Sequence, residues 1–164
     1  MKQLILMRHA KTSMYSNDGT DFSRELTEDG LADARKAGIY LSRKAILPEK
    51  ILCSSAVRAR QTAELVVKEL GCDLSLIKLK KKLYNIGRHG LSDKISKTDD
   101  SINTLLVVGH NPVMAALSRE IADSHLHGMP AGGITGFKFD IKCWKEFPGM
   151  IGELLFFTYP PFDK

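Results

Sequence analysis

The sequence predicts an α/β fold with a mostly parallel sheet that is covered by helices on both faces. Short apolar runs typical of buried strands alternate along the chain with stretches of helical periodicity. Such alternation builds right-handed strand–helix–strand units, whose strands are parallel. The last two apolar runs are separated by glycine and proline and are expected to pair antiparallel. A chain of 164 residues suits one domain with a sizeable core.

A long polar loop separates the first strand from the first helix. Gln3–Met7 is an apolar run that predicts a buried strand, and the polar residues 10–26 predict a loop. Thr27 is a typical N-cap residue, and the two acidic residues after it suit the first turn of a helix. Apolar side chains then recur on one helical face up to Leu41, so the helix is expected to end near residue 44.

A second strand and helix follow. Residues 50–53 predict a strand, and the apolar spacing after them predicts a helix over residues 56–70. Ser54 or Ser55 is expected to cap the start of this helix, and Gly71 suits its end.

The second half of the chain contains the clearest buried strand, the uncharged and β-branched run "TLLVV". Pro112 is well placed in the first turn of the helix that follows this strand. The elements expected here are, in chain order, a strand at 74–79, a short helix around 91–97 between loops, a strand at 104–108, a helix to about 122, and strands at 134–141 and 153–159.

Charge and cysteine content argue against several classes of protein. The 24 basic and 19 acidic residues give a net charge of +5, and the one dense basic block, "KLKKK" at 78–82, is expected to be a solvated strand end or loop. Three cysteines without a C-x-x-C pair do not indicate a disulfide framework or a zinc ribbon. No apolar run approaches the ~20 residues that span a bilayer, and no signal peptide is recognised. We therefore expect a cytoplasmic protein with no nucleic-acid or membrane partner.

Basic and imidazole side chains follow three predicted strands. Arg8 and His9 follow the first strand, His110 follows the strand at 104–108, and Arg58 lies in the first turn of the helix after the second strand. Carboxyl ends of parallel strands meet at one edge of a sheet, where ligands bind, so these side chains are expected to converge. Their charges would repel one another without an anion between them, and guanidinium groups match phosphate oxygens. The pattern therefore predicts a phosphate site.

The same set of side chains predicts a reaction. A histidine held among guanidinium groups has a lowered pKa, so it is neutral near pH 7 and able to attack phosphorus. The arginines would stabilise charge on the transferred phosphoryl group, and the second histidine, if protonated, would donate to another phosphoryl oxygen. This chemistry needs no metal and no cofactor, and neither is expected.

Three segments resemble motifs of the histidine phosphatase superfamily, which also contains the phosphoglycerate mutases. They are "LMRHAKTS", "CSSAVRARQTAE" and "VVGHNP", and the resemblance runs in motif order over about residues 3–118. The short chain and "DFSRELTEDG" are similar to the small bacterial branch, the phosphohistidine phosphatases. The resemblance implies a phosphoglycerate mutase-like, three-layer α/β/α sandwich with a mixed central sheet, formed as a single histidine phosphatase domain over residues 1–164.

The resemblance also implies residue roles. It implies that His9 is the nucleophile, which forms a covalent phosphohistidine, and that Arg24 in "SRELT" reaches the phosphate or the substrate. Asp21, in the same segment, is a further candidate for substrate binding. The residues implied to complete the phosphate pocket are Arg8, Arg58 and His110.

One departure from the family pattern bears on the substrate. Many members carry an acidic residue that protonates the leaving oxygen, but the comparable stretch here, "KKKLYNIGRHG", contains none. Asp18, Asp21 and Glu25 in the first loop remain possible proton donors. The imidazole of a phosphohistidine leaves easily once its ring is protonated, whereas an alkoxide depends on an acid. We therefore favour phosphohistidine on a protein partner as the substrate.

Two alternatives stay open at this point. One is a small-molecule or phosphoserine/phosphothreonine phosphatase of the same superfamily, and the other is a non-catalytic module that binds a phosphorylated ligand. The H-x-H pair His125 and His127 has no carboxylate or cysteine beside it and is expected to lie in a loop rather than to bind metal. His89 is expected to be exposed. Residues 125–164 carry no motif that indicates a role, and the sequence leaves the oligomeric state unknown.

Overall fold

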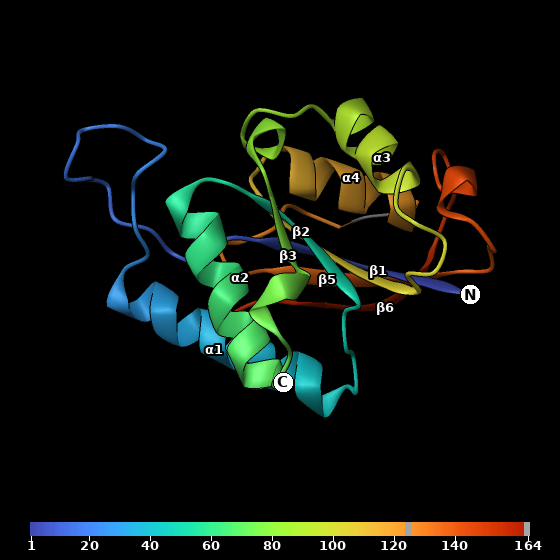
Figure 1. The fold of residues 1–164 in the computed structure, drawn as a ribbon, viewed down its shortest axis with the longest axis horizontal. Helices are drawn as coiled ribbons and strands as arrows, with labels where there is room; N and C mark the ends of the chain where they lie inside the picture. Colours follow the sequence, from blue (N-terminus) through green and yellow to red (C-terminus); the bar gives the residue numbers. More distant parts are fainter. Residues whose placement is uncertain (124–125, 163–164) are drawn as a thin grey trace.

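The computed structural model describes residues 1–123 and 126–162, in which a mixed six-stranded sheet lies between two layers of helices (Figure 1). This arrangement confirms the expected three-layer α/β/α architecture. The strands are β1 (Lys2–Arg8), β2 (Lys50–Ser54), β3 (Ile77–Lys80), β4 (Thr104–Gly109), β5 (Ile134–Phe139) and β6 (Glu153–Thr158). The helices are α1 (Glu28–Arg43), α2 (Val57–Leu70), α3 (Arg88–Ser96) and α4 (Val113–Ala122). Three short 3-10 helices are η1 (Leu74–Leu76), η2 (Lys81–Tyr84) and η3 (Trp144–Glu146).

The sheet is parallel on one side of β1 and antiparallel on the other. Its strand order is β3-β2-β4-β1-β5-β6. β1 pairs in parallel with β4, and β2 lies in parallel between β4 and β3. β5 is antiparallel to β1, and β6 is antiparallel to β5, as expected for the last two strands. The carboxyl ends of β1, β2 and β4 therefore lie at one edge of the sheet.

A separate pair of helices covers each face of the sheet. α1 and α2 lie on one face, and α3 and α4 lie on the other (Figure 1). In β1, Ile5 and Met7 join the core beside α1 and α2, whereas Leu4 and Leu6 join the core beside α3 and α4. All four side chains are fully buried. Because burial of one such side chain contributes about 1.5–3 kcal/mol, β1 is held firmly from both faces, and so is the residue that follows it.

A side-chain cap and a glycine fix the start of α1. The Thr27 hydroxyl accepts a hydrogen bond from the Gly30 amide at 3.0 Å, which confirms the expected N-cap. Gly30 also lies against the chain just beyond β1, where a Cβ atom would be 2.0 Å from the Lys11 carbonyl oxygen. Only a residue without a side chain allows this approach. The start of α1 is thus joined closely to the segment that leaves β1.

Most expected element boundaries differ from the structure by at most two residues, as for the strand expected at 134–141, which ends at Phe139. Two elements in the middle of the chain differ more. Residues 74–79 were expected to form one strand, but they form η1 followed by β3. The Asp73 carboxylate accepts a hydrogen bond from the Ser75 amide at 2.7 Å and caps a helical turn there, which delays the strand. The short helix expected around 91–97 is α3, which begins three residues earlier than expected and ends one residue earlier, at Ser96.

The expected serine cap of α2 is wrong. The N-cap of α2 is Ala56, which makes no side-chain capping bond. The Ser54 hydroxyl accepts a hydrogen bond at 3.2 Å from the amide of Ala56 itself, whereas a cap accepts from the second or third helical residue. The Ser54 oxygen also lies 2.8 Å from His110 Nε2. Ser54 therefore does not cap α2; it ends β2 and contacts His110 at the edge of the sheet.

Two histidines and the dense lysine block, which the sequence places outside the predicted site, lie at the surface. His89 on α3 and His127 in a loop are exposed, as expected, while His125 lies outside the described residues. The lysines of the segment 78–82 are exposed as well. Within residues 1–123 and 126–162, no helix combines the length and apolarity needed to cross a membrane. The same residues contain no cluster of three or more histidine, cysteine or acidic side chains that could hold a metal ion.

Candidate active site

The residues that follow β1 and β4 meet at the carboxyl edge of the sheet. Arg8 lies in register with Gly109, so His9 and His110 are the next residues on two neighbouring parallel strands. The His9 amide donates a hydrogen bond to the Gly109 carbonyl at 3.1 Å. The imidazole centroids are 5.2 Å apart, and each histidine is less than a tenth exposed. We call the space around these two rings the histidine pocket.

His9 is a neutral imidazole with a defined tautomer. Its Nδ1 lies 2.8 Å from the Ala10 carbonyl oxygen, and because a carbonyl only accepts hydrogen bonds, Nδ1 carries the proton. Nε2 therefore presents a lone pair, to which Arg58 Nε donates at 3.3 Å. Burial lowers the pKa of His9 to about 3; the bond to Ala10 opposes this shift, and the nearby His110, Arg58 and Arg8 add to it. The ring is thus uncharged at neutral pH and has one nitrogen available for nucleophilic attack.

Arg58 connects His9 to the first loop. It lies in the first turn of α2 and is 6% exposed. While its Nε faces His9, its Nη1 donates to the Asp21 carbonyl at 2.7 Å and its Nη2 donates to the Asp21 carboxylate at 2.9 Å. These three hydrogen bonds fix the plane of the guanidinium group beside the histidine pocket.

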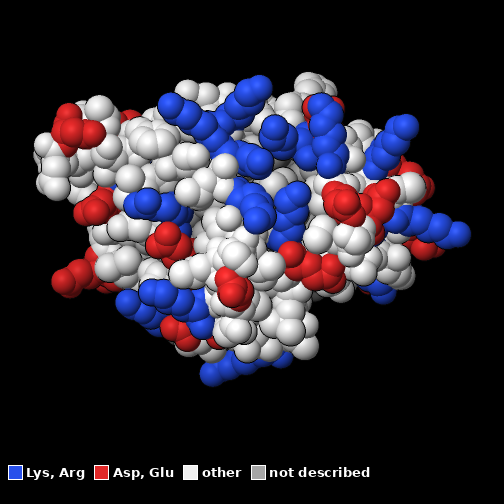
Figure 2. All heavy atoms as spheres, viewed as in Figure 1, with Lys and Arg blue, Asp and Glu red and all other residues white. Residues whose placement is uncertain are grey.

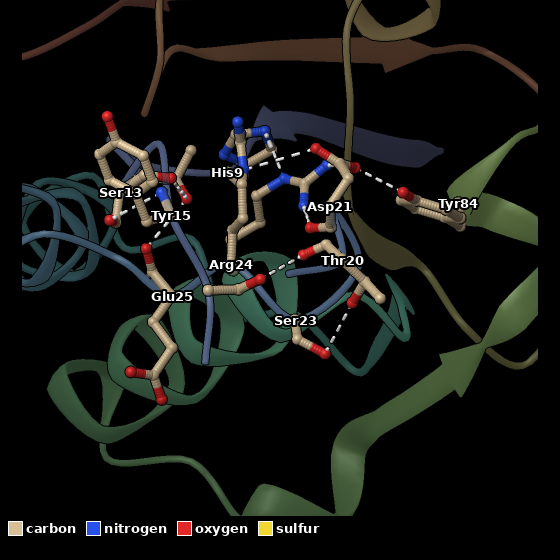
Figure 3. Close-up of polar contacts among 12 residues, drawn as sticks. His9, Ser13, Tyr15, Thr20, Asp21, Ser23, Arg24, Glu25 and Tyr84 are labelled. Carbon is tan, nitrogen blue, oxygen red and sulfur yellow. Dashed lines mark hydrogen bonds and ion pairs between the residues drawn. The ribbon is translucent and has the colours of Figure 1, made fainter. Parts of the chain in front are cut away.

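Asp21 joins Arg58 to two further side chains (Figure 3). Its carboxylate accepts a hydrogen bond from the Tyr84 hydroxyl and lies 3.4 Å from Arg24 Nε. The Tyr84 hydroxyl is the main cause that lowers the pKa of Asp21, and Arg58 and Arg24 lower it further. Asp21 is therefore ionised at neutral pH, and it holds the first loop against the rim of the histidine pocket.

His110 packs against the same tyrosine. Its ring is edge-on to the Tyr84 ring at a centroid distance of 5.5 Å, and Tyr84 also lies under the Arg58 guanidinium at 5.8 Å. The Ser54 hydroxyl contacts His110 Nε2 at 2.8 Å. Burial lowers the pKa of His110 to about 4, with Arg58 as the next cause, although the Asp21 charge opposes the shift. His110 is thus a neutral imidazole whose Nδ1 carries a proton whenever Ser54 donates to Nε2.

Arg8 is held by the loop before β5. Its Nη1 donates to the Met129 carbonyl at 3.1 Å, and the Asn111 side-chain amide donates to the same oxygen at 2.8 Å. The backbone beyond this point also supports the pocket, because the Gly132 amide donates to the His9 carbonyl at 2.9 Å. Burial is the main cause that lowers the pKa of Arg8, and the positive charge of the neighbouring Arg58 lowers it further.

Two buried nitrogens from this group of residues, Arg8 Nε and His110 Nδ1, have no partner within residues 1–123 and 126–162. A third, Arg24 Nε, makes no hydrogen bond within these residues but lies 3.4 Å from the Asp21 carboxylate in an ion pair. Leaving a buried polar atom unpaired costs about 1–3 kcal/mol. A phosphoryl group has three oxygens that accept hydrogen bonds, and guanidinium groups bind it strongly. The arrangement therefore suits a tetrahedral oxyanion.

The two other acidic residues of the first loop do not reach the histidine pocket. Asp18 accepts hydrogen bonds from the Thr20 amide and from the hydroxyls of Ser16, Thr20 and Ser23, and these bonds lower its pKa to about 2. Its role is to hold the loop together. Glu25 is exposed, and Figure 3 shows its side chain pointing away from His9. Of the three possible proton donors considered from the sequence, only Asp21 contacts the residues of the pocket.

Sequence reasoning missed two side chains of this site. Tyr84 follows the lysine block in "KKKLYNIGRHG", a stretch that was considered in the sequence only for its lack of an acidic residue. No local sequence pattern indicates that a tyrosine lines a pocket. Ser54 was interpreted as a helix cap because serine before a helix usually has that role. The register of β2 beside β4 could have indicated Ser54, since it places the end of β2 next to the end of β4.

Comparisons with known proteins agree with this geometry. The model of the histidine phosphatase superfamily (branch 1) matches residues 4–85. The uncharacterized protein Rv1276c of Mycobacterium tuberculosis is 35% identical over 116 residues, which are 71% of this chain and 70% of that protein. Pgam5 of Drosophila ananassae, a mitochondrial serine/threonine-protein phosphatase, is 36% identical over 73 residues, which are 44% of this chain and 24% of that protein.

A solved structure is similar over nearly the whole chain. The structure of a proposed phosphohistidine phosphatase SixA from Nakamurella multipartitia superposes with a TM-score of 0.82 at 25% identity, covering 98% of this chain and 96% of that chain. This similarity confirms the expected phosphoglycerate mutase-like fold. Together with the motif match and the relative from Mycobacterium tuberculosis, it shows that the chain belongs to the histidine phosphatase superfamily, branch 1.

Proposed function

We propose that residues 1–164 form one phosphatase domain that uses His9 as its nucleophile and removes phosphate from phosphohistidine on a protein partner. Membership of the superfamily supports phosphatase activity. The observation that carries the proposal is the state of His9: a neutral ring, a proton fixed on Nδ1, and the Nε2 lone pair facing a guanidinium group. Such a nitrogen can form a bond to phosphorus without first losing a proton.

In the first step, the Nε2–P bond forms while the P–N bond of the substrate breaks. The electron pair of that bond stays on the departing imidazole, which takes up a proton from solvent. Arg8, Arg58 and Arg24 neutralise the charge on the phosphoryl oxygens, and His110 Nδ1–H donates to one of them. The first step therefore yields free substrate histidine and a covalent phospho-His9.

In the second step, a water molecule attacks the phosphorus of phospho-His9. The new P–O bond replaces the Nε2–P bond, whose electron pair returns to His9, and the surplus water proton passes to solvent. Orthophosphate leaves and the neutral nucleophile is restored. Over both steps, water supplies the hydroxyl that ends on phosphorus and the proton that ends on the released imidazole.

The protonation state of Asp21 supports a P–N rather than a P–O bond as the substrate bond. Proton donation by a positioned acid contributes about 10²–10⁴-fold to rates that depend on it. Asp21 contacts the pocket, but its lowered pKa keeps it ionised at neutral pH, so it has no proton to donate. An imidazole leaving group can obtain its proton from water, whereas a serine or threonine alkoxide leaves poorly without an acid.

A serine/threonine-protein phosphatase is the second candidate, favoured by the similarity to Pgam5 of Drosophila ananassae over 73 residues. In that case Asp21 would have to gain a proton when the substrate binds, and Asp21→Asn would abolish turnover of a phosphoserine peptide. Under our proposal, Asp21→Asn retains turnover of a phosphoramidate within about tenfold, because the residue only positions Arg58.

The direct test is to trap the intermediate. The protein is mixed with a radiolabelled phosphoramidate, quenched in alkali and digested, and we expect acid-labile phosphate on the peptide that contains His9. His9→Ala should lower turnover by ~10³-fold or more, whereas the matched variant His89→Ala, at an exposed histidine, should be unaffected. Full activity of His9→Ala would refute the mechanism. A strong preference for phosphoserine over phosphoramidate would favour the second candidate instead.

A further inference from the structure

The cations of the chain are unevenly distributed near the histidine pocket. Residues 78–92 contain five lysines and arginines and no acidic residue, although the whole chain has an excess of only five positive charges. Figure 2, in the orientation of Figure 1, shows lysine and arginine side chains gathered along the upper margin of the molecule, over the end of β3 and over α3. We call Lys80, Lys81 and Lys82 the basic rim.

The basic rim lies beside the candidate active site. In the parallel register of β2 and β3, Lys80 is the partner of Ser54, whose hydroxyl contacts His110. The two following lysines form the first turn of η2, which ends at Tyr84, the residue that binds Asp21 and packs on His110. The strand register and the short η2 helix therefore hold the basic rim at the mouth of the pocket.

The three lysines are exposed but attached to a fixed backbone. None of them takes part in the ion pairs found among residues 1–123 and 126–162, and all three are exposed. The next residue, Leu83, is only 2% exposed and belongs to the core that includes Leu91 and Val113. The ammonium groups are thus free to meet a partner, while the turn that presents them is anchored.

A groove lies between His110 of the histidine pocket and the residues that follow the basic rim in the chain. It has a volume of about 370 Å³ and is lined by residues 84–88 on one side and by residues 110–113 and Ala116 on the other. Arg88 at its end is paired with Glu120 at 3.0 Å, so the unpaired positive charge lies on the side of the lysines. A segment that carries a phosphorylated side chain into the pocket can extend along this groove.

We propose that the basic rim and this groove form the docking surface for the phosphorylated protein, and that the partner presents acidic side chains next to its phosphohistidine. This inference rests on the proposed function for its phosphohistidine. Charge complementarity identifies the partner: three unpaired cations within a few residues favour an acidic surface, and at 0.1 M salt such attraction acts over about 10 Å. The active site itself then needs to recognise only the phosphoryl group, while the rim selects the protein.

The test uses three fluorescent peptides that carry a stable phosphonate analogue of phosphohistidine. The flanking residues are three aspartates, three serines or three lysines. Dissociation constants are measured by anisotropy with the wild-type protein at low and at high salt. Because exposed ion pairs are individually weak, we expect the aspartate peptide to bind about tenfold more tightly than the serine peptide at low salt, with the difference lost at high salt.

Two triple charge reversals separate the rim from overall charge. Lys80→Glu/Lys81→Glu/Lys82→Glu should abolish or invert the preference for the aspartate peptide. The control reverses three exposed cations on α1 and α2, across the sheet from α3 and α4: Arg35→Glu, Lys36→Glu and Lys68→Glu. Both variants lose the same charge, but the control should keep the preference. Turnover of a small phosphoramidate should be unchanged in both.

The outcomes are distinct. The docking surface is refuted if the rim variant keeps the preference or if the control loses it equally. It is also refuted if, in competition, a double-stranded oligonucleotide binds the rim more tightly than the aspartate peptide does. The proposed function fails separately, if the wild-type protein does not hydrolyse phosphoramidate. The anisotropy measurements still test the basic rim in that case, because peptide binding does not depend on turnover.

Discussion

The buried, neutral state of His9 predicts a defined loss of stability in mild acid. The pKa of His9 is about 3 in the folded protein, against an ordinary value of 6.5 in the unfolded chain, so unfolding takes up a proton at any pH between the two. The stabilising effect of the neutral ring is therefore fully present above pH 6.5 and is lost as the pH falls toward 3. Inside this window each pH unit removes about 1.4 kcal/mol.

Between pH 7 and pH 5 this effect amounts to about 2 kcal/mol for His9 alone. His110 adds a similar loss, because its pKa is lowered to about 4. His9→Gln removes the titrating ring, so we expect the free energy of unfolding of this variant to fall by about 2 kcal/mol less than that of the wild type over the same range. The exposed His89→Gln is the matched control and should follow the wild type.

The assay is urea unfolding at pH 7, 6 and 5, followed by circular dichroism. The buffers must be free of phosphate and sulfate, because an anion in the histidine pocket would bind the folded state and oppose the loss. Equal pH dependence in the wild type and His9→Gln would show that the His9 ring is not held neutral by burial. The electrostatic argument for its nucleophilicity would then be wrong.

Three further predictions concern the supports of the site. Tyr84→Phe removes the hydroxyl that binds Asp21 but keeps the ring against His110, so kcat/KM for a phosphoramidate should fall about 3- to 10-fold with little change in Tm, while Tyr15→Phe, at a residue 82% exposed, should change neither. Gly30→Ala places a Cβ atom 2.0 Å from the Lys11 carbonyl oxygen and should destabilise the fold by about 2 kcal/mol or more in urea unfolding, whereas Gly87→Ala, where a Cβ has nothing within 4 Å, should stay within about 1 kcal/mol of the wild type. Thr27→Ala removes the side-chain cap of α1 and should lower stability by about 1 kcal/mol, and Thr27→Ser should restore most of it; equal stability of the alanine and serine variants would contradict the cap.

Local sequence signals determined most of the secondary structure. The apolar run of β1, the Thr27 cap of α1 and the Gly71 end of α2 act over a few residues, and each appears in the structure where the sequence predicts it. The parallel part of the sheet followed from the alternation of strands and helices, and the antiparallel pairing of β5 and β6 followed from the glycine and proline between them. The boundary error at residues 74–79 arose because the side-chain bond of Asp73 competes with a strand pattern that is itself weak.

The sequence also indicated which side chains belong to the candidate site, because residues at the carboxyl ends of parallel strands must lie at one edge whatever the details of packing. That rule predicts that Arg8, His9 and His110 lie close together, and the register of β1 with β4 places them side by side in the structure. It could not assign a tautomer to His9, since the proton on Nδ1 depends on where the Ala10 carbonyl points.

Only the tertiary structure decided what surrounds these residues. Whether Asp21 was a proton donor or a charged partner of Arg58 depended on the fold of a polar loop, which has no periodic pattern from which to predict its path. Tyr84 reaches the same carboxylate from an element 63 residues away, and no local propensity encodes a contact of that separation. Local interactions set strands and helices, whereas the polarity and protonation of the pocket arise from burial and from charges that meet only when the chain is folded.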